Sequence, residues 1–185
     1  MSLKLPIGTR SLLYGAHQFL LHPLCLAIAW TKLYGFPRDV RLWVAFFVHD
    51  LGYWGKHDMD GEEGETHPEL GSKIMGRLFD AEWARFALYH SRFYAKRSHS
   101  QVSRLCIVDK MATALVPWWL YLPMVKATGE MHGYMAISDV LGTDDHNPTK
   151  TARDWHSGMQ RFLVKYVEQH KNLPEITMPQ FKAAA

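Results

Sequence analysis

The chain has 185 residues, which suffices for one domain with a hydrophobic core but not for two comfortable ones. Hydrophobic residues make up 48% and charged residues 21% of the sequence, ordinary values for a soluble globular protein. The formal net charge of +3 argues against a dedicated nucleic-acid-binding protein, whose basic surface is stronger and clustered, and it is compatible with a small anionic ligand.

Two further features bear on the cellular location. Cys25 and Cys106 form no CxxC motif and imply no disulfide framework, so we expect two thiols in a reducing cytoplasm. The N-terminus lacks the apolar core of a secretory signal. The most apolar run, residues 112–125, contains two prolines and is shorter than the about 20 residues of a membrane helix, so we expect no membrane span.

Helical patterns begin near the N-terminus. Residues 11–21 are expected to form a short first helix or turn. Pro23 suits the first position of a helix that we expect over residues 23–34, where Gly35 and Pro37 end it. A strongly apolar helix is expected over residues 37–51.

The second half of the pattern starts after a loop over residues 52–64, which is rich in Gly, Asp and Glu. Helices are then expected over residues 66–79, 81–89 and 100–115. Thr66 and Glu69 have the spacing of a capping box at the start of the first of these.

Beyond Pro117 the helical signal weakens, and residues 129–148 mix helix-like and loop-like stretches. Residues 151–170 are expected to form an amphipathic helix. Its inward side chains would be Trp155, Met159, Phe162, Leu163 and Tyr166. Strand patterns are almost absent, so the predicted fold is all-α, with one helical domain over residues 1–171 and a tail over residues 172–185.

The adjacent pair His49-Asp50 ends the apolar stretch of residues 42–48. Burying two ionisable groups there is costly unless a partner compensates, and a metal cation is one such partner. Neighbours on a helix point about 100° apart, but both reach one cation where the helix ends, as Gly52 permits. For an isolated His-Asp pair, hydrogen bonding to nearby backbone is the more common explanation.

Four other residues favour a metal site over hydrogen bonding to the backbone. His22 and His67 lie near the starts of expected helices, and His90 follows the end of another. Asp109 is a carboxylate within an apolar helix. Four imidazoles and two carboxylates suit a divalent transition metal such as Fe, Mn, Co or Ni.

The order of these six residues, His…His-Asp…His…His…Asp, closely resembles the HD-domain superfamily. This is a helical family of metal-dependent phosphohydrolases with some oxygenase relatives, such as myo-inositol oxygenase and a phosphonate-cleaving enzyme. The resemblance covers about residues 20–115. The sequence around the motifs agrees with it, as AFFVHDLG over residues 45–52, HPELG over 67–71 and VDK over 108–110.

The resemblance implies a dinuclear centre with two divalent metal ions, of which Fe or Mn is expected first and Co, Ni or Mg after them. By position, the implied ligands are His22, His49, Asp50 and Asp109 for one ion, and Asp50, His67 and His90 for the other. Asp50 would bridge the two ions and is the central catalytic group, because its two oxygens can neutralise both cations.

The resemblance implies a phosphohydrolase that acts on a phosphate ester or nucleotide. The alternative is a di-iron oxygenase that cleaves a C–C or C–P bond in a small polar substrate, because the ligand order is the same. A binding module with a degenerate site is a third alternative, and the complete ligand set argues against it. A homodimer is compatible with the sequence.

Two positions depart from the family pattern. Many members have Lys where Tyr53 stands here, and Lys56 is a candidate to reach the site instead. Members with a double His have a second His where Ser91 stands, and no GYP motif is present. The missing second His and the missing GYP motif both argue against the cyclic-dinucleotide HD-GYP class.

The remaining candidates are cations and histidines around the pattern. Arg92 and Lys96 follow His90 closely and are candidates for binding phosphate or carboxylate, with a solvated helix face as an equally weighted alternative. His17 competes with His22 as the first ligand, but the expected helix start and the spacing favour His22. Histidines outside the pattern, including His156, are expected at the surface or in local hydrogen bonds.

Overall fold

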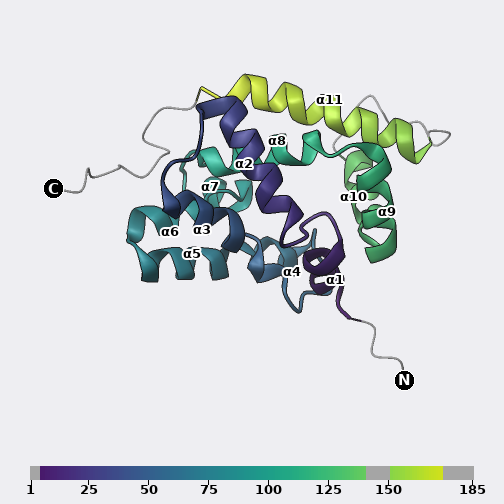
Figure 1. Cartoon of the computed structure of the whole chain (residues 1–185). Coiled ribbons are helices and arrows are strands. Elements are labelled where there is room, and N and C mark those ends of the chain that lie inside the picture. Colours follow the sequence, from purple (N-terminus) through teal and green to yellow (C-terminus); the bar gives the residue numbers. More distant parts are fainter. Residues whose placement is uncertain (1–4, 141–150, 173–185) are drawn as a thin grey trace.

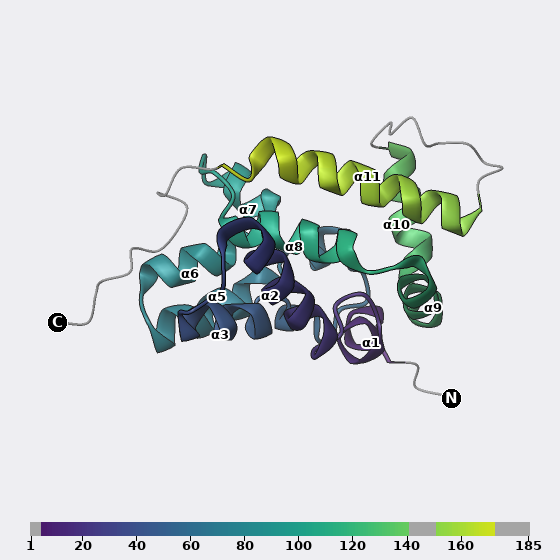
Figure 2. The same ribbon diagram turned by 45° about the horizontal axis from the view of Figure 1, so that its top comes forward.

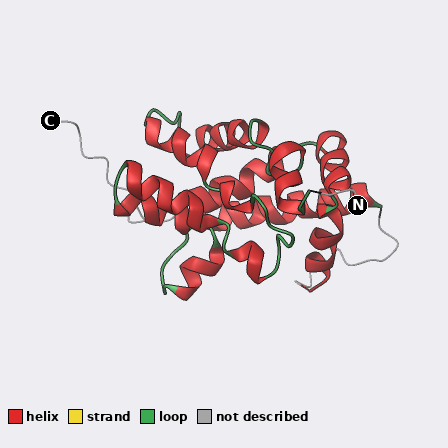
Figure 3. Ribbon diagram, turned by 90° about the horizontal axis from the view of Figure 1, so that it is seen from below, coloured by secondary structure: helices red, strands yellow, loops and turns green. Residues whose placement is uncertain are grey.

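The computed structural model describes residues 5–140 and 151–172. Within these residues every regular element is a helix and no strand is present (Figure 3). The predicted all-α fold is therefore confirmed. Nearly all of the predicted tail and the end of the 129–148 stretch lie outside the described residues, so the predicted domain limits stay predictions.

The helices follow one another with short connections. In chain order they are α1 (Ile7–Tyr14), α2 (Leu21–Tyr34), α3 (Val40–Val48), the short 3₁₀ helix η1 (Leu51–Tyr53), α4 (Glu62–Glu65), α5 (Pro68–Leu78), α6 (Ala81–Leu88), α7 (Arg92–Arg97), α8 (Arg104–Leu115), α9 (Trp118–Thr128), α10 (Glu130–Val140) and α11 (Ala152–His170). Among the described helices, none taken singly has the length and apolar content needed to cross a membrane.

Helix α2 runs through the middle of the molecule and packs against both α3 and α8 (Figures 1 and 2). Helix α11 lies along α8, at the top of Figure 1. Helices α5 and α6 pack against each other at one end of the molecule, while α9 and α10 form the other end. Helix α1 contacts α9 and η1, which brings the N-terminal helix beside the loop after α3.

The main hydrophobic core lies between α2, α3, α5, α6 and α8. Its large side chains include Trp30, Phe46 and Trp83, and the Trp30 and Phe46 rings lie 5.7 Å apart. Burying a large apolar side chain stabilises the fold by about 1.5–3 kcal/mol. Phe46 is in the turn of α3 that precedes the His-Asp pair, so the core fixes where that pair emerges.

The ends of α2 and α3 follow from local residues. Helix α2 begins at Leu21, slightly earlier than predicted, so that His22 lies within its first turn. It ends at Gly35, whose φ of 86° favours glycine. Helix α3 begins at Asp39, whose carboxylate accepts a hydrogen bond from the Arg41 backbone N–H at 2.8 Å.

The predicted capping box at α5 is wrong. The chain enters α5 from α4, and His67 at its N-cap has helical φ and ψ of −55° and −32°, where a capping side chain needs an extended backbone. The Thr66 hydroxyl instead donates a hydrogen bond to the Glu63 carbonyl. Glu69 accepts a hydrogen bond from the Tyr94 hydroxyl.

The predicted helix over residues 151–170 is confirmed as α11, but part of its inward face is wrong. Phe162 is 41% exposed, whereas His156, expected at the surface or in a local hydrogen bond, is fully buried. The ring of Tyr121 lies 5.1 Å from the His156 ring. Helix α9 thus covers a side of α11 that the sequence of α11 alone does not identify as buried.

Candidate metal centre

Six side chains from separate parts of the chain converge between α2, α3, α5, α6 and α8. They are His22 in α2, His49 and Asp50 after α3, His67 before α5, His90 after α6, and Asp109 in α8. Their side chains are between 1% and 11% exposed, apart from Asp109 at 20%. The structure therefore brings together all six residues that the sequence singles out.

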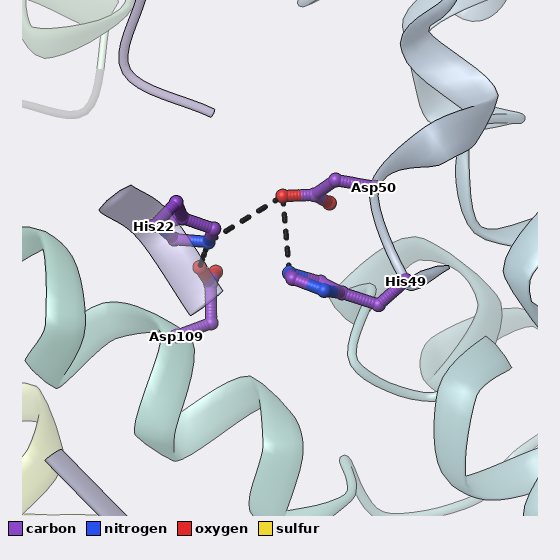
Figure 4. Close-up of side chains that lie close together, drawn as sticks. All are labelled: His22, His49, Asp50 and Asp109. Carbon is purple, nitrogen blue, oxygen red and sulfur yellow. Dashed lines mark ion pairs between the residues drawn. The ribbon is translucent and has the colours of Figure 1, made fainter. Parts of the chain in front are cut away.

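One group of four residues surrounds an oxygen of Asp50 (Figure 4). The Nε2 atom of His22 lies 3.2 Å from Asp109 Oδ1 and 3.5 Å from Asp50 Oδ2. The Nε2 atom of His49 lies 3.0 Å from the same Asp50 Oδ2. All four residues offer ligand atoms within 4.8 Å of one another, so this group can hold a metal ion.

A second group shares Asp50 through its other oxygen. Nε2 of His67 and Nε2 of His90 lie 3.6 Å and 3.3 Å from Asp50 Oδ1. This group also satisfies the spacing of metal ligands. Each oxygen of Asp50 thus faces its own pair of histidines, which is the geometry that a bridging carboxylate requires.

Backbone carbonyls fix which nitrogen of three imidazoles carries hydrogen. The Nδ1 atoms of His49 and His67 lie 3.1 Å and 2.7 Å from the carbonyl oxygens of Phe46 and Gly64, and Nδ1 of His90 contacts a carbonyl in the same way. A carbonyl only accepts, so each Nδ1 donates. In the neutral ring this leaves the lone pair on Nε2, the arrangement typical of metal-binding histidines.

This set of donor atoms fits a bound cation. The Nε2 atoms of His67 and His90 lie 3.0 Å apart, and two lone pairs at that distance repel. His22 Nε2, His49 Nε2 and Asp50 Oδ2 are buried without a hydrogen-bond partner. Each such atom costs about 1–3 kcal/mol. A divalent metal in each group would satisfy all of them.

The local electrostatics keep the two carboxylates and His67 in the forms that bind metal. Burial raises the pKa of Asp50, but His49 and His90 outweigh it and hold that pKa well below its usual range. Burial also raises the pKa of Asp109, yet His22 and Lys110 lower it overall. Burial, with the neighbouring His90, lowers the pKa of His67 to about 3. The carboxylates are thus anionic and His67 is neutral at pH 7.

Two glycines allow the close approach of the segments that carry the ligands. A Cβ atom at Gly52 would lie 2.0 Å from the carbonyl oxygen of His67. A Cβ atom at Gly71 would lie 2.6 Å from the carbonyl oxygen of Val48. The ring of Tyr53 stacks on His67 with centroids 4.1 Å apart.

The three predicted substrate-binding cations have different surroundings. Lys56 Nζ donates a hydrogen bond to Thr66 Oγ1 at 2.6 Å, next to His67. Arg92 is exposed, and its guanidinium lies 6.0 Å from the centroid of the Tyr166 ring; Lys96 is also exposed. No described hydrogen bond or ion pair joins these cations to the six clustered residues, so their role stays a prediction.

His17 belongs to neither ligand group, which agrees with the preference for His22, but it lies beside the cluster. Its Nδ1 is 2.9 Å from Ser11 Oγ and 3.5 Å from Glu130 Oε1. Burial lowers the pKa of His17, but Glu130 and Asp50 together raise it to about 9. The partner Glu130 follows Pro117, where the sequence pattern is weak, so the sequence carries no signal for this contact.

Comparisons of the chain with protein-family models, with curated proteins and with solved structures found no match in any of the three. The cluster itself is compatible with an HD-type metal site.

Proposed function

We propose that the chain is a metal-dependent phosphohydrolase with a dinuclear centre. The observation that carries this proposal is the bridging position of Asp50, whose two oxygens each face two imidazole Nε2 atoms within 3.6 Å. Four imidazoles and two carboxylates suit Fe or Mn before Mg, which prefers oxygen ligands.

His22, His49, Asp50 and Asp109 would hold one ion and Asp50, His67 and His90 the other, and such ions would supply a more acidic bound water and a polarised phosphoryl oxygen. The protein supplies the geometry. Asp50 belongs to both ligand groups and so fixes their distance from each other. The Nδ1 hydrogen bonds of His49, His67 and His90 fix the ring orientations. A substrate approaches from the side of Asp109, the most exposed of the six side chains.

The proposed substrate is a small anionic phosphate ester or nucleotide. Among the three candidate cations, Lys56 has a hydrogen-bond partner, Thr66, that directly precedes the ligand His67. We propose that Lys56 contacts the phosphate and that Arg92 and Lys96 contribute to a cationic rim. Such cations offset the charge on the phosphoryl oxygens.

Turnover of a substrate panel tests the proposed function. The protein is loaded with Mn, Co, Ni or Fe and assayed for phosphate release from phosphomonoesters, phosphodiesters and nucleotides. We expect turnover of at least one class, and its loss in Asp50→Ala. Absence of turnover across the panel with fully loaded protein would refute a phosphohydrolase.

A second sample, without added metal, tests the oxygenase alternative, which the nitrogen-rich ligand set keeps open because imidazole also suits iron. Protein purified in air is examined for iron content and by electron paramagnetic resonance. A mixed-valent di-iron signal that changes with a small polar substrate, together with oxygen consumption, would favour the oxygenase over the hydrolase.

A further inference from the structure

A hydrogen-bond chain fixes the orientation of the His17 ring. Ser11 Oγ donates to Glu130 Oε1 at 2.6 Å. A hydroxyl has only one hydrogen to donate, so Ser11 Oγ must accept from His17 Nδ1, 2.9 Å away. Nδ1 therefore carries hydrogen, and Nε2 lies on the edge of the ring turned away from Ser11.

The hydrogen-bond chain ends at the carboxylate of Glu130, which several donors hold in place. The Glu130 side chain is fully buried, and it accepts hydrogen bonds from the hydroxyls of Ser11, Thr128 and Tyr134 and from the Ala16 backbone N–H. Four donors stabilise the ionised form. Glu130 Oε1 also lies 3.5 Å from His17 Nδ1, so Ser11 and Glu130 hold the same edge of the ring.

The ring of His17 borders both halves of the metal cluster. It lies 5.8 Å from the ring of His22, a residue of the first group. It also lies 4.8 Å from the ring of Tyr53, which stacks on His67 of the second group. The side chains of His17 and Asp109 are each 20% exposed, so a small molecule can reach both residues.

We infer that His17 is a further substrate-binding residue, whose Nε2 forms a hydrogen bond with a phosphate oxygen held at the metal centre. Ser11 and Glu130 are positioning residues, because they hold the opposite edge of the ring. The identity of the ligand as a phosphate rests on the proposed function. The orientation of the ring and its place beside the cluster rest on the contacts of His17 alone.

Two amide variants separate the two edges of the ring. In His17→Asn the amide nitrogen takes the place of Nδ1 and keeps the bond to Ser11, but nothing replaces Nε2. In His17→Gln the amide nitrogen reaches the place of Nε2. A purely structural role would favour the Asn variant, whereas a substrate-binding role favours the Gln variant.

The measurement is the affinity of Mn-loaded protein for inorganic phosphate by isothermal titration calorimetry, with Mn stoichiometry and thermal midpoint measured alongside. We expect His17→Asn to bind Mn as the wild type does and phosphate about 10- to 100-fold more weakly, the effect of losing a hydrogen bond to a charged group. His17→Gln should recover a large part of that loss. Ser11→Ala, which frees the ring, should weaken phosphate binding by a smaller factor.

Three results would overturn the inference: no phosphate binding by the Mn-loaded wild type, equal phosphate affinities of the two amide variants, or phosphate loss that merely follows Mn loss. The outcome is separate from that of the turnover panel. Phosphate binding that depends on Nε2 without turnover of any phosphate ester would support His17 as an anion-binding residue and refute the phosphohydrolase.

Discussion

Three imidazoles of the cluster are oriented by the same kind of hydrogen bond to the backbone. His49, His67 and His90 each donate from Nδ1 to the carbonyl three residues earlier, at the end of a helix or turn. The local backbone therefore orients each ring before any ion binds. Such outer bonds raise ligand basicity, and their loss typically weakens metal binding 10- to 100-fold.

The two ligand groups predict different metal stoichiometries for single-residue variants. His67→Ala removes a ligand of the second group only, so we expect one ion per chain in place of two. Asp50→Ala removes the shared ligand, so we expect less than one ion per chain. The measurement is metal content by plasma mass spectrometry after purification without chelator.

His57 provides a matched control, because it is exposed, lies in the loop before α4 and belongs to neither ligand group. His57→Ala should keep two ions per chain. If His67→Ala also kept two ions, the assignment of His67 to a separate second group would be wrong.

At the scale of elements, the contact between α5 and the end of α3 sets the distance between the two groups. Gly71 in α5 lies against the backbone at the end of α3. A Cβ atom at Gly71 would meet the Val48 carbonyl oxygen at 2.6 Å and the His49 Cα at 2.8 Å. These are backbone atoms and cannot turn aside as a side chain does. We expect Gly71→Ala to lower the thermal midpoint and to weaken metal binding at least tenfold, measured by metal titration.

Gly76→Ala is the control on the same helix. A Cβ atom there meets only the Ala84 Cβ, at 3.0 Å, and alanine favours a helix by about 1 kcal/mol over glycine. We expect its metal affinity to equal that of the wild type. Equal metal affinities of the two variants would show that the approach of α5 does not control the cluster.

The start of α3 makes a pH-dependent contribution to stability. Asp39 caps the helix and forms an ion pair with Arg41. Burial raises the pKa of Asp39, but the Arg41 guanidinium and backbone N–H lower it overall. A carboxyl whose folded-state pKa is lowered stabilises the protein above its unfolded-state pKa of about 4, and this contribution is lost as the pH falls further.

We expect Asp39→Ala to cost about 1 kcal/mol of stability at pH 7, measured by urea unfolding, because it removes both the cap and the ion pair. Asp39→Ser keeps a capping oxygen, so it should lose only the ion pair, which contributes roughly 0.2–1 kcal/mol at a partly exposed position. The difference between the wild type and Asp39→Ser should shrink as the pH falls from 5 towards 3. A difference that is constant over this range would contradict the assigned ion pair.

For the molecule as a whole, the sequence predicts what depends on local pattern. The positions of His49, Asp50 and Asp109 stand out because ionisable groups in apolar helices are rare, and the helix over residues 81–89 follows from its own periodicity. The contact between Ser11 and Glu130 could not be predicted, because it joins residues far apart in sequence. The burial of His156 likewise depends on α9, which packs against α11.

The cluster connects α2 and α8 with the segments that follow α3 and α6 and precede α5, so ion binding should stabilise the entire bundle. An ion that binds only the folded chain adds about 2.7 kcal/mol when its free concentration is 100 times its dissociation constant. In a chain of this size that corresponds to about 5–10 °C in thermal midpoint for each ion, or about 10–20 °C for the two ions of the centre. We therefore expect a chelator to lower the midpoint of the metal-loaded wild type by this amount in differential scanning calorimetry, and added Mn to restore it. Asp50→Ala serves as the control and should show no shift with either treatment. If the thermal midpoint of the wild type stayed the same after complete metal removal, the buried Nε2 atoms of His22 and His49 would have partners other than a metal.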